Sequence, residues 1–121
     1  MKANELRIGN LVKNNEPRYG DKILVIESIG DNDTVNVFFR QYPMSELEPL
    51  PLTEEWLLKF GFYKNIDTEL FEKGGFQIEI SVLKCLFYLP EFGDWHKEIE
   101  YVHQLQNLWF ALTSEELTIA E

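Results

Sequence analysis

Two histidines are the residues of this chain best suited to metal or acid–base chemistry. His96 follows Asp94 and Trp95, and His103 lies further along the same stretch. Zinc is held by three or four such side chains in a fixed geometry, and the spacing here matches no established zinc motif. The sequence therefore assigns no metal ligand and no cofactor. A small metal-dependent hydrolase using His96 and His103 stays as one alternative.

Nucleophilic chemistry finds little support in the remaining residues. Cys85, the single cysteine, lies in the apolar run 84–89, and burial in apolar surroundings raises the pKa of a thiol and makes it inert. Gly74 and Gly75 are followed by a strand-like stretch, so they are expected in a hairpin turn and not in a phosphate-binding loop. No serine stands in a strained glycine elbow. No catalytic residue is assigned, and the chain is expected not to be an enzyme.

The segment 101–113, YVHQLQNLWFALT, is predicted to form a long helix whose first twelve residues contain no Asp, Glu, Lys or Arg. At 100° per residue, its Leu and Trp side chains form a stripe about 120° wide that suits a core. His103, Gln106 and Phe110 lie on another side. Together with Trp95 they form a candidate interaction surface, since aromatic residues often anchor protein contacts. Alternatively, the first half of the same chain covers this side of the helix.

The elements that must position these residues fall into two lobes. Three strand-like runs separated by polar turns predict an antiparallel β-meander lobe over residues 1–48, and an SH3-like barrel is one way for such a meander to close. The expected strands are 8–12, 22–29 and 34–40. The proline-rich segment 48–52 must be extended and is expected to act as the hinge between the lobes.

Residues 49–121 are predicted to form an α-β-β-β-α lobe. Thr53 is expected to cap a short helix that ends at Gly61. A three-stranded antiparallel sheet follows, and the helix at 101–113 is expected to pack on it. The remaining expected elements are strands at 70–73, 76–80 and 84–89, a loop at 91–100 and a final strand at 115–119. The fold class is α+β, and the two lobes are expected in one compact domain.

The charge of the chain suits solubility alone or an acidic surface aimed at a basic partner. The net charge is −10, of which residues 53–121 carry −8. Affinity for DNA or RNA rests on Lys and Arg that neutralise phosphates, so no direct nucleic-acid binding is expected. The acidic residues Glu91, Asp94, Glu98 and Glu100 surround Trp95 and would attract a basic partner. An acidic inhibitor that mimics nucleic acid is therefore a second alternative.

The chain has no membrane signal. No apolar segment approaches the ~18 residues of a membrane span, and the first residues lack the apolar core of a signal peptide. A cytoplasmic protein without membrane contact is expected.

Three motifs resemble a known family. ELRIGN at 5–10, PLPLTEEWLLKFGF at 49–62 and YVHQLQNLWFALTSEEL at 101–117 are similar to small proteins encoded in Bacteroides-type bacterial genomes and their prophages. A glycine commonly stands there at the position of Ser114, which suits the left-handed residue after a helix. The family has no established activity. The resemblance implies an accessory protein of a mobile element, and we expect it to act by contacts with a host or phage protein.

Overall fold

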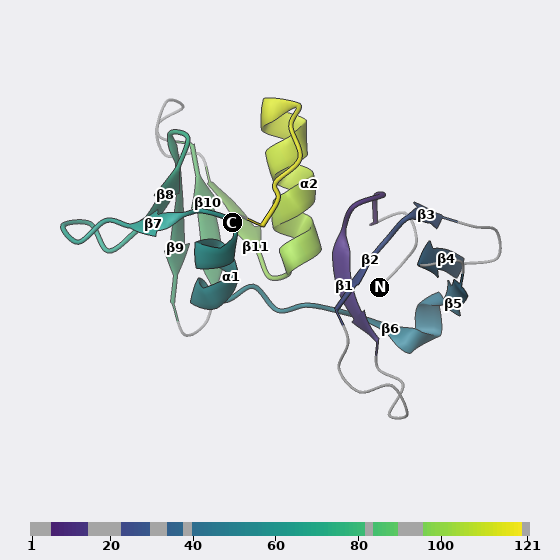
Figure 1. Cartoon of the computed structure of the whole chain (residues 1–121). Helices are drawn as coiled ribbons and strands as arrows, with labels where there is room; N and C mark the ends of the chain where they lie inside the picture. Colours follow the sequence, from purple (N-terminus) through teal and green to yellow (C-terminus); the bar gives the residue numbers. More distant parts are fainter. Residues whose placement is uncertain are drawn as a thin grey trace. The chain divides into compact units, whose positions relative to one another are not determined.

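The protein has an α+β fold that divides into two compact units. The computed structural model describes residues 6–14, 23–29, 34–37, 40–81, 84–89 and 96–119 (Figure 1). Unit 1 comprises Met1–Pro51 and Tyr101–Glu116, and unit 2 comprises Leu52–Glu100 and Leu117–Glu121. The sequence placed the boundary at residues 48/49 and the long helix in the second lobe. The contacts instead assign that helix to the first unit.

Unit 1 contains two three-stranded antiparallel sheets, with strand orders β2-β1-β6 and β3-β4-β5. The buried face of the first sheet carries Val12, Leu24 and Leu47, which form a core with Leu6, Ile26 and Tyr42. The elements are β1 (Leu11–Asn14), β2 (Ile23–Val25), β3 (Ser28–Ile29), β4 (Thr34–Val37), β5 (Arg40–Pro43), η3 (Met44–Glu46) and β6 (Leu47–Pro49).

The predicted antiparallel pairings of consecutive strands are present as β1 with β2 and β3 with β4, but they lie in two sheets and not in one meander. The strand list was also wrong in two places. The expected strand 22–29 is two strands, because the chain changes partner within it: the Ile26 N–H donates to the Asn10 carbonyl, next to β1, and the Glu27 N–H donates to the Asn36 carbonyl of β4, each at 3.0 Å. The strands β5 and β6 were missed, since Arg40–Pro43 and Leu47–Pro49 contain proline and lack a period-two apolar pattern. An SH3-like closure stays a prediction, because residues 15–22 and 30–33 lie outside the described residues.

Two of the three segments at which the chain passes from one unit to the other are hydrogen-bonded to each other. The Val102 N–H donates to the Leu50 carbonyl at 2.8 Å, and the Leu52 N–H donates to the Glu100 carbonyl at 2.9 Å. Pro51 and Tyr101 form a bridge between these two bonds. The proline-rich segment is therefore extended, as predicted, and it is paired with the residues that precede the long helix.

Unit 2 begins with α1 (Glu54–Lys59), whose two ends confirm the predicted caps. Thr53 Oγ1 accepts a hydrogen bond from the Trp56 N–H at 3.4 Å. Gly61 has a φ of 90°, in the left-handed region. The N–H groups of Gly61 and Phe62 donate to the carbonyls of Leu58 and Leu57, each at 3.0 Å. This pair of bonds is a Schellman motif, which satisfies the last carbonyls of the helix.

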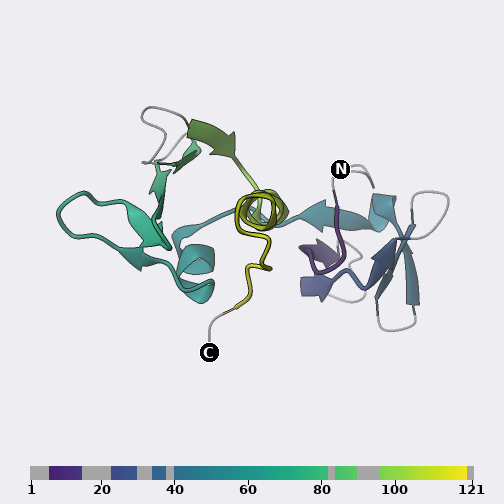
Figure 2. The same cartoon turned by 90° about the horizontal axis from the view of Figure 1, so that it is seen from above.

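The sheet of unit 2 has five antiparallel strands in the order β11-β10-β9-β8-β7. Its buried face carries Phe71, Ile78 and Phe87, and α1 lies on one side of the sheet in both views (Figures 1 and 2). The strands are β7 (Tyr63–Lys64), β8 (Phe71–Lys73), β9 (Phe76–Ile80), β10 (Cys85–Tyr88) and β11 (His96–Ile99).

Local sequence signals gave part of this sheet and missed its two edges. The hairpin β8-β9 is confirmed, with φ of 59° at Gly74 and 86° at Gly75 as its two-residue turn requires. The edge strand β11 was expected to be a loop, because HKEI is mostly polar and shows no apolar alternation. The edge strand β7 has only two residues. Residues 115–119 were expected to form a strand and do not.

The long helix α2 (Val102–Thr113) is present as predicted and ends at a left-handed residue. Ser114 has φ 60° and ψ 17°, and its N–H donates to the Phe110 carbonyl at 2.8 Å. Of the described helices, none has both the length and the apolar character to span a membrane.

Replacing Ser114 with glycine should stabilise the protein by about 0.5–1 kcal/mol, because glycine adopts a positive φ without the steric cost of a Cβ atom. Urea unfolding of the Ser114→Gly variant measures the gain. Ser114→Ala keeps the Cβ atom and should give none. A Ser114→Gly variant no more stable than the wild type would contradict this account of the helix end.

Candidate functional site

Gln106 and His103, two members of the candidate interaction surface, are buried. The Gln106 side chain is 2% exposed, its Oε1 accepts from the Leu11 N–H at 2.9 Å, and its Nε2 donates to the Gly9 carbonyl at 3.1 Å. His103 is 1% exposed, and its ring stacks on that of Tyr101 with centroids 5.8 Å apart. Both ends of the Gln106 amide therefore bind the backbone of the first unit, and neither residue is open to a partner.

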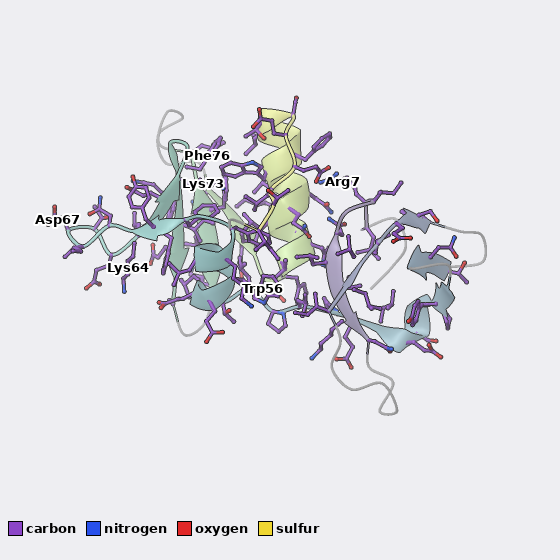
Figure 3. All side chains as sticks on the ribbon, viewed as in Figure 1. Arg7, Trp56, Lys64, Asp67, Lys73 and Phe76 are labelled. Atoms are coloured by element: carbon purple, nitrogen blue, oxygen red, sulfur yellow. The ribbon has the colours of Figure 1, made fainter. Side chains whose placement is uncertain are left out.

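Arg7 places a positive charge beside the uncharged helix α2. Its guanidinium donates to Asn107 Oδ1 at 2.9 Å and to Glu116 Oε1 at 2.8 Å. A third bond reaches the Gln106 carbonyl at 3.2 Å. The same group lies 4.4 Å from the centre of the Phe110 ring, a distance typical of a cation–π contact. Phe110 is 40% exposed. Of the three residues of α2 in the predicted surface, it is therefore the one that solvent reaches. Arg7 is labelled in Figure 3.

The residues of the metal-dependent alternative are only partly described. His96 lies in β11, exposed, with its ring 5.7 Å from that of Tyr88. His103 belongs to the other unit. Asp94 and Trp95, like Glu91, lie outside the described residues. Within the ranges that the structure describes, no group of three or more His, Cys, Asp and Glu side chains is placed to hold a metal ion.

The five-stranded sheet has a face that the sequence analysis did not single out. Strand register places eight side chains on the side opposite the buried face, which we call the outer face. One row crosses all five strands, and a second row crosses three. The rows are Tyr63-Glu72-Gln77-Tyr88-His96 and Glu79-Leu86-Glu98.

Charges are sorted by sign across this sheet. The glutamates of its strands, Glu72, Glu79 and Glu98, all lie on the outer face. The lysines lie on the opposite, buried face, because the residues with which they pair in register belong to that face. They are Lys64, Lys73 and Lys97. Lys73 Nζ donates to the Phe60 carbonyl, and Lys64 Nζ lies 6.0 Å from the centre of the Phe71 ring. The strands of this sheet thus place only negative formal charges on the outer face when His96 is neutral.

Hydrogen bonds link the carboxylates of the outer face to its polar neighbours. Gln77 Nε2 donates to Glu72 Oε1 at 2.8 Å, and this bond is the main reason that the pKa of Glu72 lies below its usual value. The Tyr88 hydroxyl donates to Glu79 Oε2 at 2.9 Å, which raises the pKa of Tyr88. A bond to Glu72 likewise raises the pKa of Tyr63. These bonds favour the ionised form of Glu72 and the protonated forms of the two tyrosines.

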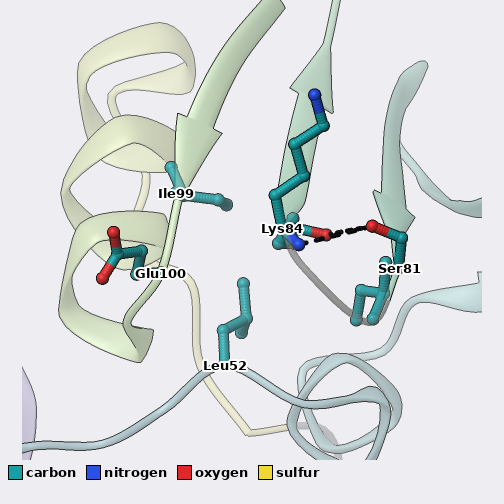
Figure 4. A pocket seen from close by; sticks show the side chains of 7 residues that line it. Leu52, Ser81, Lys84, Ile99 and Glu100 are labelled. Carbon is teal, nitrogen blue, oxygen red and sulfur yellow. Dashed lines mark hydrogen bonds between the residues drawn. The ribbon is translucent and has the colours of Figure 1, made fainter.

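An open pocket of about 370 Å³ lies at one end of β9 and β10 (Figure 4). Leu52, Ile80 and Ile99 give it apolar walls, and Lys84 and Glu100 bring opposite charges. Ser81 Oγ donates to the Lys84 carbonyl at 3.0 Å. The remaining lining residue is Cys85, 7% exposed, and burial raises the pKa of its thiol to about 12. The pocket therefore contains no activated nucleophile among its described residues.

Comparison with family models, curated proteins and solved structures found no match to this chain.

Replacing Gln106 with alanine should lower the free energy of unfolding by about 2–4 kcal/mol, because the Leu11 N–H and the Gly9 carbonyl lose their buried partner. Urea unfolding measures the loss, and amide exchange at Leu11 should become faster. Gln104→Ala, the same change at an exposed position of α2, should lower the free energy of unfolding by less than about 1 kcal/mol. Equal effects of the two substitutions would contradict the role of Gln106.

The Cys85 thiol should be almost unreactive in the folded protein. A pKa of about 12 leaves about one thiol in ten thousand ionised at pH 8. An unfolded chain, with an ordinary thiol pKa, has about a quarter ionised. Alkylation should therefore be at least about a thousandfold slower in buffer than in concentrated urea. Comparable rates in the two solvents would show that the thiol is open to solvent.

The same pKa shift predicts how the stability depends on pH. Because the pKa of the Cys85 thiol is higher in the folded protein, the unfolded chain loses the thiol proton at a lower pH than the folded protein does. The wild type should therefore lose stability relative to Cys85→Val as the pH rises from 9.0 towards about 12. Urea unfolding of both proteins across this range measures the difference, and parallel profiles would contradict the shift.

Proposed function

We propose that this protein is a non-enzymatic binding protein of a mobile element, which acts in the cytoplasm through contacts with a host or phage protein. The observation that carries the proposal is the sorting of charge across the five-stranded sheet. Alternation along a strand alone does not require Glu and Lys to separate by sign, yet the three glutamates share the outer face. Such a face favours a basic partner.

The outer face also has the side chains that stabilise a protein contact once it has formed. Tyr63 and Tyr88 offer aromatic surface with a hydroxyl, a combination that is enriched at interfaces. Leu86 lies between Glu79 and Glu98 in the second row. With strands about 4.8 Å apart, the backbones that bear these two glutamates are separated by about 10 Å. Leu86 itself is only 9% exposed, so the exposed carboxylates of Glu79 and Glu98 are the groups that two cationic groups of a partner can bind.

The acidic inhibitor that mimics nucleic acid remains a narrower version of this proposal. It uses the same carboxylates, and its partner would be a protein whose own basic site binds DNA or RNA. Competition distinguishes the two versions, because a nucleic-acid mimic and an oligonucleotide exclude each other from that partner.

Reversing the charge of the outer face should weaken partner binding. The Glu79→Lys, Glu98→Lys variant is expected to bind at least about tenfold more weakly than the wild type, because each change replaces an attraction by a repulsion. Affinity purification from cells of the source bacterium identifies the partner of the wild type. Titration of that purified partner then gives the dissociation constants.

A matched control separates the outer face from net charge. Glu54→Lys, Glu55→Lys produces the same change of charge on exposed residues of α1, and it should bind within about twofold of the wild type. Equal weakening in both variants would mean that total charge and not this face drives binding. Equal partner recovery by all three proteins would overturn the proposal.

A further inference from the structure

The loop that joins β7 to β8 carries an exposed isoleucine. Ile66 is 90% exposed, the highest value among the large apolar side chains of the described residues. Figures 1 and 3 show this loop extending away from the sheet of unit 2, with the labelled Asp67 at its end. An aliphatic side chain in water lacks the stabilisation that burial gives, and near the end of a projecting loop it is placed where a partner could bury it.

Hydrogen bonds within the loop give Ile66 a defined position. Asn65 Oδ1 accepts from the N–H groups of Asp67 at 2.9 Å and Thr68 at 3.3 Å. The Asn65 N–H donates to the Leu70 carbonyl at 2.8 Å, and the Glu69 N–H donates to the Asn65 carbonyl at 2.7 Å. Because the loop is already closed on itself, binding through Ile66 requires little further ordering of the chain.

Asn65 also joins this loop to the outer face. Its Nδ2 donates to Glu72 Oε2 at 3.4 Å, and Glu72 belongs to the row that crosses all five strands. Tyr63, in the same row, is 60% exposed and stands two residues before Asn65. The exposed apolar side chain and the acidic face are therefore parts of one continuous surface in unit 2.

We propose that Ile66 is the apolar anchor of the outer face and enters a socket on the partner protein. The inference rests on the proposed binding function and states what the partner must offer. Asp67 and Glu69, both exposed, flank the anchor and Glu72 lies at its base. The socket is therefore apolar inside and rimmed by Lys or Arg side chains.

A second copy of this chain is a poor occupant. Joining two copies through this surface would bring the glutamates of two outer faces together in a chain of net charge −10. Repulsion between like charges opposes such a dimer and is a common way to exclude a wrong partner.

The test places a photo-crosslinking amino acid at position 66 of the full-length protein, in cells of the source bacterium, and at position 58 as the control. Leu58 is the matched site because it is an aliphatic residue of the same unit with 56% exposure. Position 66 should give one discrete adduct with the purified partner, mapped to an apolar site flanked by Lys or Arg. Position 58 should give none.

Substitution gives the second readout. Ile66→Ser should weaken partner binding by about thirtyfold, whereas Ile66→Val and Leu58→Ser should stay within about threefold of the wild type. An adduct between two copies, an adduct mapped to an acidic or fully polar site, or unchanged binding by Ile66→Ser would overturn the inference. If Glu79→Lys, Glu98→Lys still weakens binding in that case, the proposed function stands without this anchor. If neither substitution affects binding, both fail.

Discussion

The buried amide of Gln106 is the interaction on which unit 1 depends. It satisfies the Leu11 N–H and the Gly9 carbonyl, and the first of these bonds joins residues 95 positions apart in the sequence. Gly9 can present its carbonyl there because it adopts a φ of 94°. A charged side chain at position 106 would be buried against the backbone at a high desolvation cost. The absence of charge at position 106 is thus explained by its bonds to the backbone beside β1, whereas Gln104, Ala111 and Leu112 of the same helix are exposed and uncharged without such a cause.

Local signals in the sequence were sufficient to predict elements whose hydrogen bonds join residues only a few positions apart. Thr53, Gly61 and the pair Gly74-Gly75 fix a helix start, a helix end and a hairpin through their own backbone preferences, and the structure has all three. The edge strands had no such signal. β11 exposes three of its four residues, so its sequence needs no apolar alternation. The assignment of α2 to the first unit depends on pairings between distant residues, which no local pattern contains.

The candidate surface was predictable in a similar, partial way. Alternation in Gln77-Ile78-Glu79 indicates an acidic face opposite an apolar one, but the sorting of Lys64, Lys73 and Lys97 appears only when the register of five strands is known. The sequence favoured Gln106 because amides and aromatics lie beside it on the helical wheel. A helical wheel does not distinguish a side chain that is exposed and available to a partner from one that is hydrogen-bonded to the backbone of another part of the same chain.

The sheet of unit 2 is better suited to binding through its face than through its edges. Strand addition requires a long, flat edge with few charges. At one edge, β7 has two residues, and at the other, β11 has exposed His96, Lys97 and Glu98. Charged side chains on an edge strand disfavour pairing with a further strand. The binding function proposed above therefore fits the outer face, with its tyrosines and carboxylates, better than either edge, and it relies on side chains rather than on the backbone.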